Sequence, residues 1–170
     1  MFALNNEIVS LTSEKLRNKF GEALLSEETT MDMPVYTFKK ECIADVLRFL
    51  FDDETLKYRF LTDLCGIHYP DNEFQFGVIY HLHSMENNQR IRLKVFASLT
   101  DITVPTATTV FKGANWMERE TFDFYGIIFT GHPNLERILN VAEMDYFPLR
   151  KEYPLEDGTR TDKNDDFFGR

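Results

Sequence analysis

Residues 59–96 read RFLTDLCGIHYPDNEFQFGVIYHLHSMENNQRIRLKVF, and this stretch decides the fold. Apolar and polar residues alternate most clearly at 74–80 and 91–96, which is typical of strands with one buried face. Two turn signals, YPDN at 69–72 and MENN at 85–88, divide the stretch. It therefore predicts a three-strand meander, with strands at 59–68, 74–83 and 91–96.

Two helical patterns precede the meander. Apolar residues recur mostly every three or four positions in 5–20, which is followed by Gly21, and again in 41–51. Short runs with β propensity lie between these helices, at 23–27 and 34–38. Helices placed ahead of a hairpin-linked sheet imply an α+β, two-layer domain in which the helices pack on a mixed or antiparallel sheet.

The C-terminal third is less regular. Asn115 can cap a helix over Trp116–Tyr125 that ends at Gly126, and Pro133 is expected to open a short helix that continues through Arg137. After Ala142 the helical period is lost, and prolines and acids follow. We therefore predict a globular α+β domain at 1–141 and an extended C-terminal docking tail at 142–170.

Composition excludes several classes of function. The formal net charge of −9 disfavours nucleic acid and anionic lipid as partners. No stretch approaches the roughly 18 apolar residues of a membrane span, so we expect no direct membrane insertion. The start lacks the basic region of a signal peptide, which favours the cytosolic side of a membrane.

Cofactor binding is not expected on this chain alone. Cys42 and Cys65 are predicted to be reduced, buried thiols, and two cysteines cannot supply the usual four thiolates of an iron–sulfur cluster. The glycine motifs that bind nucleotides are absent from the sequence.

Acids and an arginine crowd the predicted helix at 116–125. Glu120 and Asp123 share a helical face, and Arg119 precedes Asp123 by four residues. Together with Glu118 they could perform acid–base chemistry or form an ion-pair network in an interface. We favour the network, because a neighbouring arginine keeps carboxylates ionised and opposes the raised pKa of a general acid.

Histidines offer weaker candidates. His81 and His83 lie two apart on a predicted strand and could chelate a metal, but no third ligand is obvious nearby. His68 has still less support. His132 could be a catalytic base, yet no nucleophile elbow accompanies it, and a structural turn histidine is favoured. No metal site is therefore predicted.

Aromatic residues concentrate in the C-terminal third, where aromatics and arginines are typical anchors of protein interfaces, although some must fill the core. They are Phe122, Phe124, Tyr125, Phe129, Tyr146, Phe147 and Tyr153.

Two motifs carry a family resemblance. ERETFDFYGIIFTGHPNLERIL at 118–139, followed by PLRKEYPL at 148–155, resembles the signature of the C subunit of NADH-quinone oxidoreductase, the respiratory complex I. LCGIHYP, VIYHLHS and RIRLKV in the meander are also similar, so the resemblance covers about residues 60–155. Asn134 and Glu136 depart from the pattern, where an acid and a basic residue are expected.

The resemblance implies a non-redox structural subunit in the hydrophilic arm, peripheral on the cytoplasmic side of a bacterial inner membrane. Its partners would be the large quinone-site subunit (the D subunit) and neighbouring iron–sulfur subunits. NADH (or ferredoxin), FMN, iron–sulfur clusters and quinone would belong to the parent complex, with no catalytic residue on this chain. The expected subunit-interface residues are Glu118, Arg119, Glu120, Asp123, Tyr125, His132, Arg137, Tyr146, Arg150 and Tyr153.

An alternative is an independent acid–base enzyme that uses Glu118 or Glu120 with His132. That hypothesis requires a closed pocket around these groups and a shifted carboxylate pKa.

Overall fold

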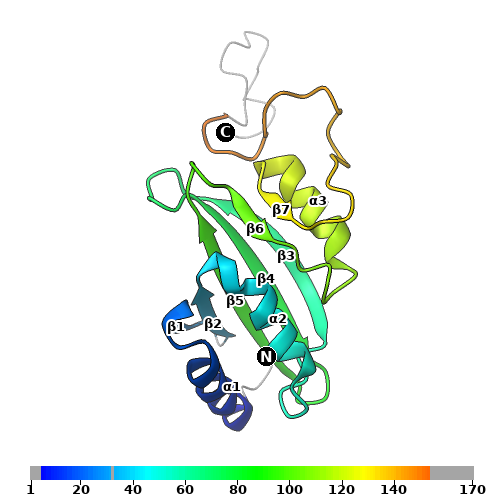
Figure 1. Cartoon of the computed structure of the whole chain (residues 1–170). Coiled ribbons are helices and arrows are strands. Elements are labelled where there is room, and N and C mark those ends of the chain that lie inside the picture. Colours follow the sequence, from blue (N-terminus) through cyan, green and yellow to red (C-terminus); the bar gives the residue numbers. More distant parts are fainter. Residues whose placement is uncertain (1–4, 32, 154–170) are drawn as a thin grey trace, which may run out of the picture.

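The computed structural model describes residues 5–31 and 33–153, which form three helices, two short 3-10 helices and two sheets (Figure 1). The elements in chain order are α1 (Asn6–Phe20), η1 (Gly21–Ala23), β1 (Leu24–Thr30), β2 (Met33–Phe38), η2 (Lys40–Cys42), α2 (Ile43–Asp52), β3 (Phe60–His68), β4 (Phe76–Ser84), β5 (Gln89–Ala97), β6 (Thr103–Pro105), α3 (Ala114–Tyr125) and β7 (Ile128–Thr130).

The main sheet is mixed. Its five strands run in the order β1-β2-β5-β4-β3, and every neighbouring pair is antiparallel except β2 and β5. The predicted meander forms its β3-β4-β5 part. A second, two-stranded sheet pairs β6 with β7 in parallel.

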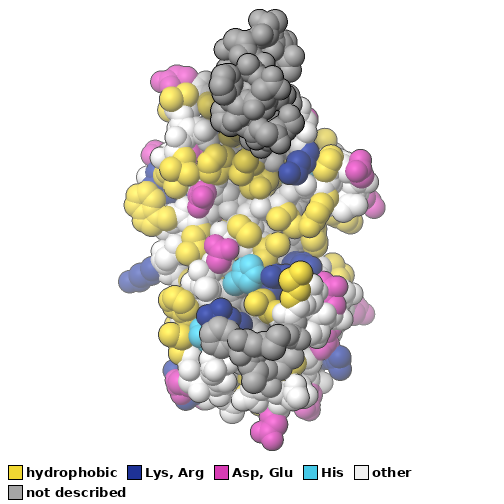
Figure 2. Space-filling model, turned by 180° about the vertical axis from the view of Figure 1, so that it is seen from behind, with side chains coloured by type: hydrophobic (Ala, Val, Ile, Leu, Met, Phe, Trp, Pro, Cys, Tyr) yellow, Lys and Arg dark blue, Asp and Glu magenta, His cyan; other side chains and the backbone are white. Residues whose placement is uncertain are grey.

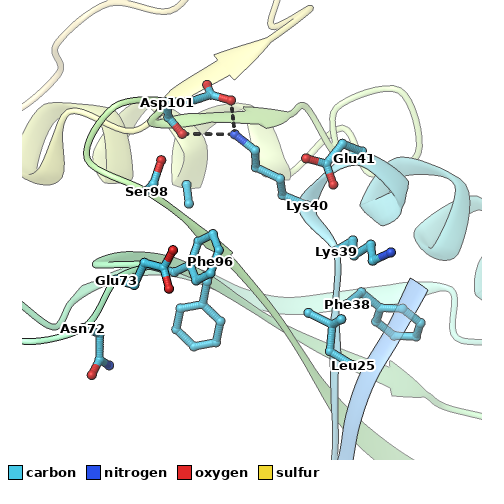
Figure 3. Close-up of a pocket in the computed structure, with 12 residues that line it drawn as sticks. Leu25, Phe38, Lys39, Lys40, Glu41, Asn72, Glu73, Phe96, Ser98 and Asp101 are labelled. Carbon is cyan, nitrogen blue, oxygen red and sulfur yellow. Dashed lines mark hydrogen bonds and ion pairs between the residues drawn. The ribbon is translucent and has the colours of Figure 1, made fainter. Parts of the chain in front are cut away.

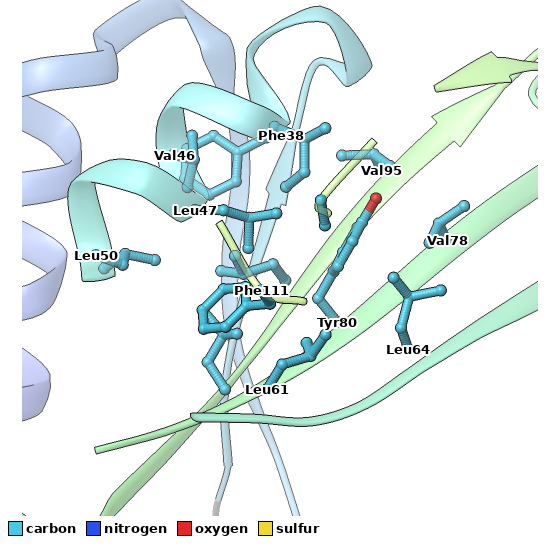
Figure 4. Packing of buried hydrophobic residues seen from close by; sticks show 14 of the residues in the cluster. Phe38, Val46, Leu47, Leu50, Leu61, Leu64, Val78, Tyr80, Val95 and Phe111 are labelled. Atoms are coloured by element: carbon cyan, nitrogen blue, oxygen red, sulfur yellow. The ribbon is translucent and has the colours of Figure 1, made fainter. Parts of the chain in front are cut away.

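The core lies between α2 and one face of the main sheet (Figure 4). Ile43, Val46, Leu47 and Leu50 share one face of α2 and are fully buried. They meet the alternating inward residues of β4 and β5, and Phe111 from the loop before α3 closes the cluster. Burial of this apolar surface is the main force that stabilises the domain.

Helix α3 lies on the same face of the sheet as α2, but over β3. Gly66 of β3 pairs with the core residue Val78, so both point to the covered face. A Cβ atom at Gly66 would lie 2.6 Å from Tyr125 and 2.9 Å from Thr121. Glycine at this position therefore lets α3 approach the sheet closely.

The start of α1 and the end of α3 follow the expected chemistry, but the start of α3 does not. Asn115 is not its cap, because the helix already begins at Ala114 after Gly113, with no side-chain hydrogen bond at its N-terminus. The Asn5 side chain accepts a hydrogen bond from the Ile8 backbone N–H at the start of α1. Gly126, with φ of 75°, ends α3 in the left-handed conformation that glycine adopts at little cost.

The α+β, two-layer prediction is confirmed, and so are the three helices and the meander. Three expectations are wrong: Asn115 does not cap α3, the segment after Pro133 forms turns rather than a short helix, and Cys42 and Cys65 are half-buried rather than buried. The strands β6 and β7 were not among the expected elements. Both cysteines are free thiols.

The predicted tail is described only in part. Residues 142–153 run in turns against α3, whereas 154–170 lie outside the described residues. None of the helices in the described ranges has the length and apolar character needed to cross a bilayer.

Candidate docking site

Residues 131–153 form an irregular segment that α3 holds in place; we call it the braced segment. Asp123, fully buried on α3, is its main anchor. Asp123 Oδ2 accepts hydrogen bonds from the backbone N–H groups of Ile138, Leu139 and Asn140 at 3.1, 2.8 and 2.9 Å. Burial disfavours the ionised form, yet these N–H groups and Arg137 hold the pKa of the Asp123 carboxyl well below its usual range.

Arg137 links two parts of the braced segment to α3. Its Nη1 donates to Asp123 Oδ1 and to the Asp123 carbonyl, both at 2.8 Å. Its Nη2 donates to the carbonyls of Met144 and Tyr146, both at 2.9 Å. The guanidinium also lies 4.8 Å from the centre of the Phe147 ring. One side chain therefore fixes the backbone at three places.

Arg150 fastens the far end of the segment. Its Nε donates to the Tyr125 carbonyl at 2.7 Å, and its guanidinium lies between the rings of Phe76 and Phe147 at 4.8 and 4.6 Å. A Cβ at Gly126 would lie 2.6 Å from both Arg150 and Phe147, so glycine is required for this approach.

The next residue joins the segment to the main sheet. The Lys151 backbone N–H donates to His68 Nδ1 at 3.0 Å, and the His68 ring stacks on Phe76 at 4.5 Å. His68 is therefore a structural residue at the end of β3.

Glu118 fixes the loop after β6 to α3. Its two carboxylate oxygens accept hydrogen bonds from the Thr106 hydroxyl and the Ala107 backbone N–H, both at 2.6 Å. Desolvation raises the pKa of Glu118 to about 7, against the opposing effect of these two hydrogen bonds. Our expectation that a neighbouring arginine would keep it ionised is wrong.

His132 lies beside Glu118 in the interior. Its Nε2 is 3.2 Å from the Asn115 carbonyl and 4.0 Å from the Glu118 carboxylate. Its Nδ1 accepts a hydrogen bond from the Asn134 backbone N–H, which shapes the turn after β7.

The expected Arg119–Asp123 pair does not form. Arg119 stacks on Trp116 and donates to the Glu136 carbonyl at 3.1 Å, while Asp123 takes Arg137, fourteen residues further on, as its partner. Helical spacing alone could not reveal this pair, because Arg137 lies outside α3.

The ten predicted interface residues fall into three sets. The side chains of Glu118, Asp123 and His132 are fully buried within the chain; Arg119, Tyr125, Arg137 and Arg150 are partly exposed; Glu120, Tyr146 and Tyr153 are exposed. Their role in an interface remains a prediction.

Large apolar side chains that sequence reasoning left out are exposed on the braced segment. Leu139 is 64% exposed, Val141 63% and Leu149 42%, beside Tyr146 and Tyr153, whose rings contact each other at 5.1 Å. Viewed from behind, hydrophobic side chains gather in the upper half of the molecule, with Asp and Glu side chains among them (Figure 2). The braced segment thus exposes five large side chains, Leu139, Val141, Tyr146, Leu149 and Tyr153, on a backbone that hydrogen bonds hold against α3.

The histidine pair on β4 makes other contacts. His81 Nε2 accepts a hydrogen bond from Arg92 Nε at 2.9 Å, and its Nδ1 lies 3.8 Å from Asp63. Within residues 5–31 and 33–153, no group of three or more histidine, cysteine or acidic side chains could hold a metal ion.

A hollow of about 720 Å³ lies at the end of the main sheet where β3 turns into β4 and where β2 and β5 end (Figure 3). Apolar side chains of Leu25, Phe74 and Phe96 line it, and Lys40 at its rim pairs with Asp101. Its lining includes none of the ten predicted site residues.

The alternative of an acid–base enzyme has no support in this geometry. Glu118 has the raised pKa that such an enzyme needs, but it is fully buried and both its oxygens bind the chain itself. Glu120 lies on the exposed side of α3. A substrate would have no access to the Glu118 carboxyl.

The fold and the site define a small α+β protein that exposes apolar side chains on an irregular segment packed against α3. Comparison with known proteins gives the family. The sequence profile described as "Respiratory-chain NADH dehydrogenase, 30 Kd subunit" matches residues 36–159, and the chain belongs to this family.

Similar bacterial proteins agree. The chain is 48% identical over 154 residues to the NADH-quinone oxidoreductase C subunit of Roseiflexus sp. (strain RS-1), a match that spans 90% of this chain and 86% of the relative. It is 41% identical over 150 residues to the NADH-quinone oxidoreductase C subunit 1 of Rhizobium meliloti (strain 1021), with 88% and 74% covered. The chain is thus a non-redox subunit of the hydrophilic arm of this oxidoreductase complex.

Solved structures share the fold. A trypsin-resistant fragment (1–134) of Nqo5 is 26% identical and superposes with a TM-score of 0.64, over 75% of this chain and 99% of the fragment. A chain of the membrane-bound sulfane sulfur reductase, an archaeal respiratory membrane complex, is 22% identical with a TM-score of 0.72, over 88% and 85% of the two chains.

Proposed function

We propose that this chain docks the large quinone-site subunit (the D subunit) and neighbouring iron–sulfur subunits, and keeps them in register for electron transfer to quinone. The complex would lie on the cytoplasmic side of a bacterial inner membrane, with this chain peripheral to the bilayer. NADH or ferredoxin, FMN, the clusters and quinone would be handled by the other subunits. No catalytic residue is assigned to this chain.

The observation that carries this proposal is that apolar side chains are exposed on a segment whose backbone is held in place by contacts with α3. The exposed side chains of Leu139 and Val141 add little to the stability of the fold, because apolar surface stabilises a protein only when it is buried. Yet Asp123, Arg137 and Arg150 hold their backbone in one arrangement. Such preorganisation lowers the entropy cost of binding, which favours a docking surface.

In this proposal, some of the predicted interface residues position the docking surface, and others contact the partner. Asp123, Arg137 and Arg150 act through the braced segment, and Glu118 acts through the loop after β6. Tyr146, Tyr153 and Glu120 face outward and would touch a partner directly. Aromatic residues such as these tyrosines are frequent anchors at interfaces.

The test is a substitution on the apolar surface. In cells that lack the native chain, Leu139→Ser should be produced as a folded protein, but the intact complex recovered from membranes should fall roughly tenfold, as expected for loss of about 1.4 kcal/mol at an interface. Unfolding of the purified chain should match the wild type, because Leu139 is 64% exposed.

Leu25→Ser is the matched control, since Leu25 is 58% exposed on the edge strand β1, across the sheet from β3 and α3. It should leave the recovered complex unchanged. Equal recovery with Leu139→Ser and wild type would contradict docking through this surface.

A further inference from the structure

The exposed charges of the braced segment are mostly negative. Its exposed carboxylates are Glu136, Glu143, Asp145 and Glu152. Lys151 is the exposed cation of the segment, because Arg137 and Arg150 turn inward and bind Asp123 and backbone carbonyls. The braced segment therefore exposes apolar side chains together with an excess of negative charge.

Two of these carboxylates are unpaired within the part of the chain that the structure describes. Glu152 lies 3.7 Å from His68 and 3.8 Å from Arg150. By contrast, the Glu143 and Asp145 side chains make no ion pair or hydrogen bond among residues 5–31 and 33–153. They flank the apolar positions in the sequence, since Val141 precedes Glu143 and Tyr146 follows Asp145.

Other occupants of this surface are disfavoured by the same charges. A second copy would oppose carboxylates with carboxylates, and like charges that face each other across an interface cost several kcal/mol. Anionic lipid headgroups and nucleic acid would be repelled for the same reason. A partner surface with lysine or arginine around an apolar centre would match both the exposed apolar side chains and the negative charge of the braced segment.

We propose that the partner surface that covers the braced segment is basic, with lysine or arginine side chains that pair with Glu143 and Asp145 around an apolar centre. This inference rests on the proposed docking function. Charges at the rim of an interface act mainly on the association rate and on the choice of partner, whereas the apolar centre supplies most of the affinity.

The experiment reverses the charges in the whole complex. In cells that lack the native chain, Glu143→Lys with Asp145→Lys should lower the recovered complex roughly tenfold when membranes are extracted at about 0.05 M salt, and less at about 0.5 M salt, where charges are screened. Glu7→Lys with Glu22→Lys is the control, because it makes the same change in net charge at exposed acids near α1.

A second measurement identifies the contact. A zero-length carbodiimide cross-linker applied to the native complex should join Glu143 or Asp145 to a lysine of another subunit, and mass spectrometry reads out the joined peptides. Glu143→Gln with Asp145→Asn should remove these products while most of the complex is still recovered.

The outcomes separate the two proposals. If Leu139→Ser impairs assembly while the reversed pair behaves like its control and no cross-link forms, docking stands and the basic partner is wrong. If Leu139→Ser also behaves like wild type, both proposals fail.

Discussion

Burial of Glu118 makes the free energy of unfolding depend on pH. In the unfolded chain its carboxyl has the ordinary pKa near 4.5, whereas in the folded protein burial raises that pKa to about 7. Between these values the folded state binds more protons than the unfolded state, so the free energy of unfolding falls as pH rises. The shift corresponds to about 3 kcal/mol.

Glu118→Gln should remove this contribution, because glutamine resembles the protonated side chain and does not titrate. Urea unfolding at a series of values from about pH 5 to about pH 8 should show a smaller loss of stability than in the wild type. Glu120→Gln, on the exposed side of the same helix, should keep the wild-type slope. A wild-type slope in Glu118→Gln would refute the assignment.

Asp123 stabilises the fold in its ionised form, whereas burial of Glu118 favours the protonated form. It is ionised in the fold and accepts hydrogen bonds from three backbone N–H groups and two side chains. Asp123→Asn leaves the Arg137 guanidinium without its buried counter-charge, which typically costs about 3–5 kcal/mol. The urea midpoint should fall accordingly, while Asp145→Asn, at an exposed acid of the braced segment, should leave it unchanged.

Residue types show where charged side chains gather along the chain, but not how they pair. The concentration of acids and arginines in 118–139 was readable from the sequence, yet the Asp123–Arg137 pair was not, because no local period connects α3 to an irregular segment. The raised pKa of Glu118 was also missed, since it follows from burial against the loop after β6 rather than from neighbours on the helix.

At the scale of elements, the approach of α3 to the sheet depends on one glycine. Gly66→Ala would place a methyl group 2.6 Å from the Tyr125 ring and 2.9 Å from the Thr121 methyl group, so these side chains or α3 itself must shift. Overpacking of this kind costs roughly 1–3 kcal/mol, and the thermal midpoint should fall.

Gly113→Ala is the matched control for that substitution. Gly113 lies just before α3 with φ of −64°, and a Cβ there would meet no atom within 4 Å. Its effect on stability should be small or favourable, because alanine reduces the entropy of the unfolded chain. Equal destabilisation by both substitutions would contradict the close-packing argument.

Regular elements were predictable where one period extends over many residues. The apolar stripe of α2 and the alternation in β4 and β5 have such periods, and both elements were found. The strands β6 and β7 have three residues each, and the paired residues lie 25 positions apart in the sequence. No local pattern therefore predicts them. The helix expected from Pro133 to Arg137 does not form, and the backbone N–H groups of the three residues that follow it bind Asp123.

For the whole molecule, the two-layer domain and the braced segment should behave as one cooperative unit, although the segment has no regular structure. Its amides at Ile138, Leu139 and Asn140 donate to a fully buried carboxylate, so they open only when α3 separates from the segment. Hydrogen exchange should therefore be slow at these three amides, close to that of α3. The outward edge of β1, which pairs only with β2 among the strands of the described ranges, should exchange much faster.

Asp123→Asn gives the decisive comparison in the same experiment. Exchange at 138–140 should accelerate by at least about a hundredfold, as local opening becomes easier by about 3 kcal/mol, while the central strands β4 and β5 remain the slowest to exchange. Rates typical of an unstructured chain at 138–140 in the wild type would mean that the segment is not preorganised. The docking surface would then have to order on binding, and the entropic advantage that we assign to Asp123, Arg137 and Arg150 would be lost.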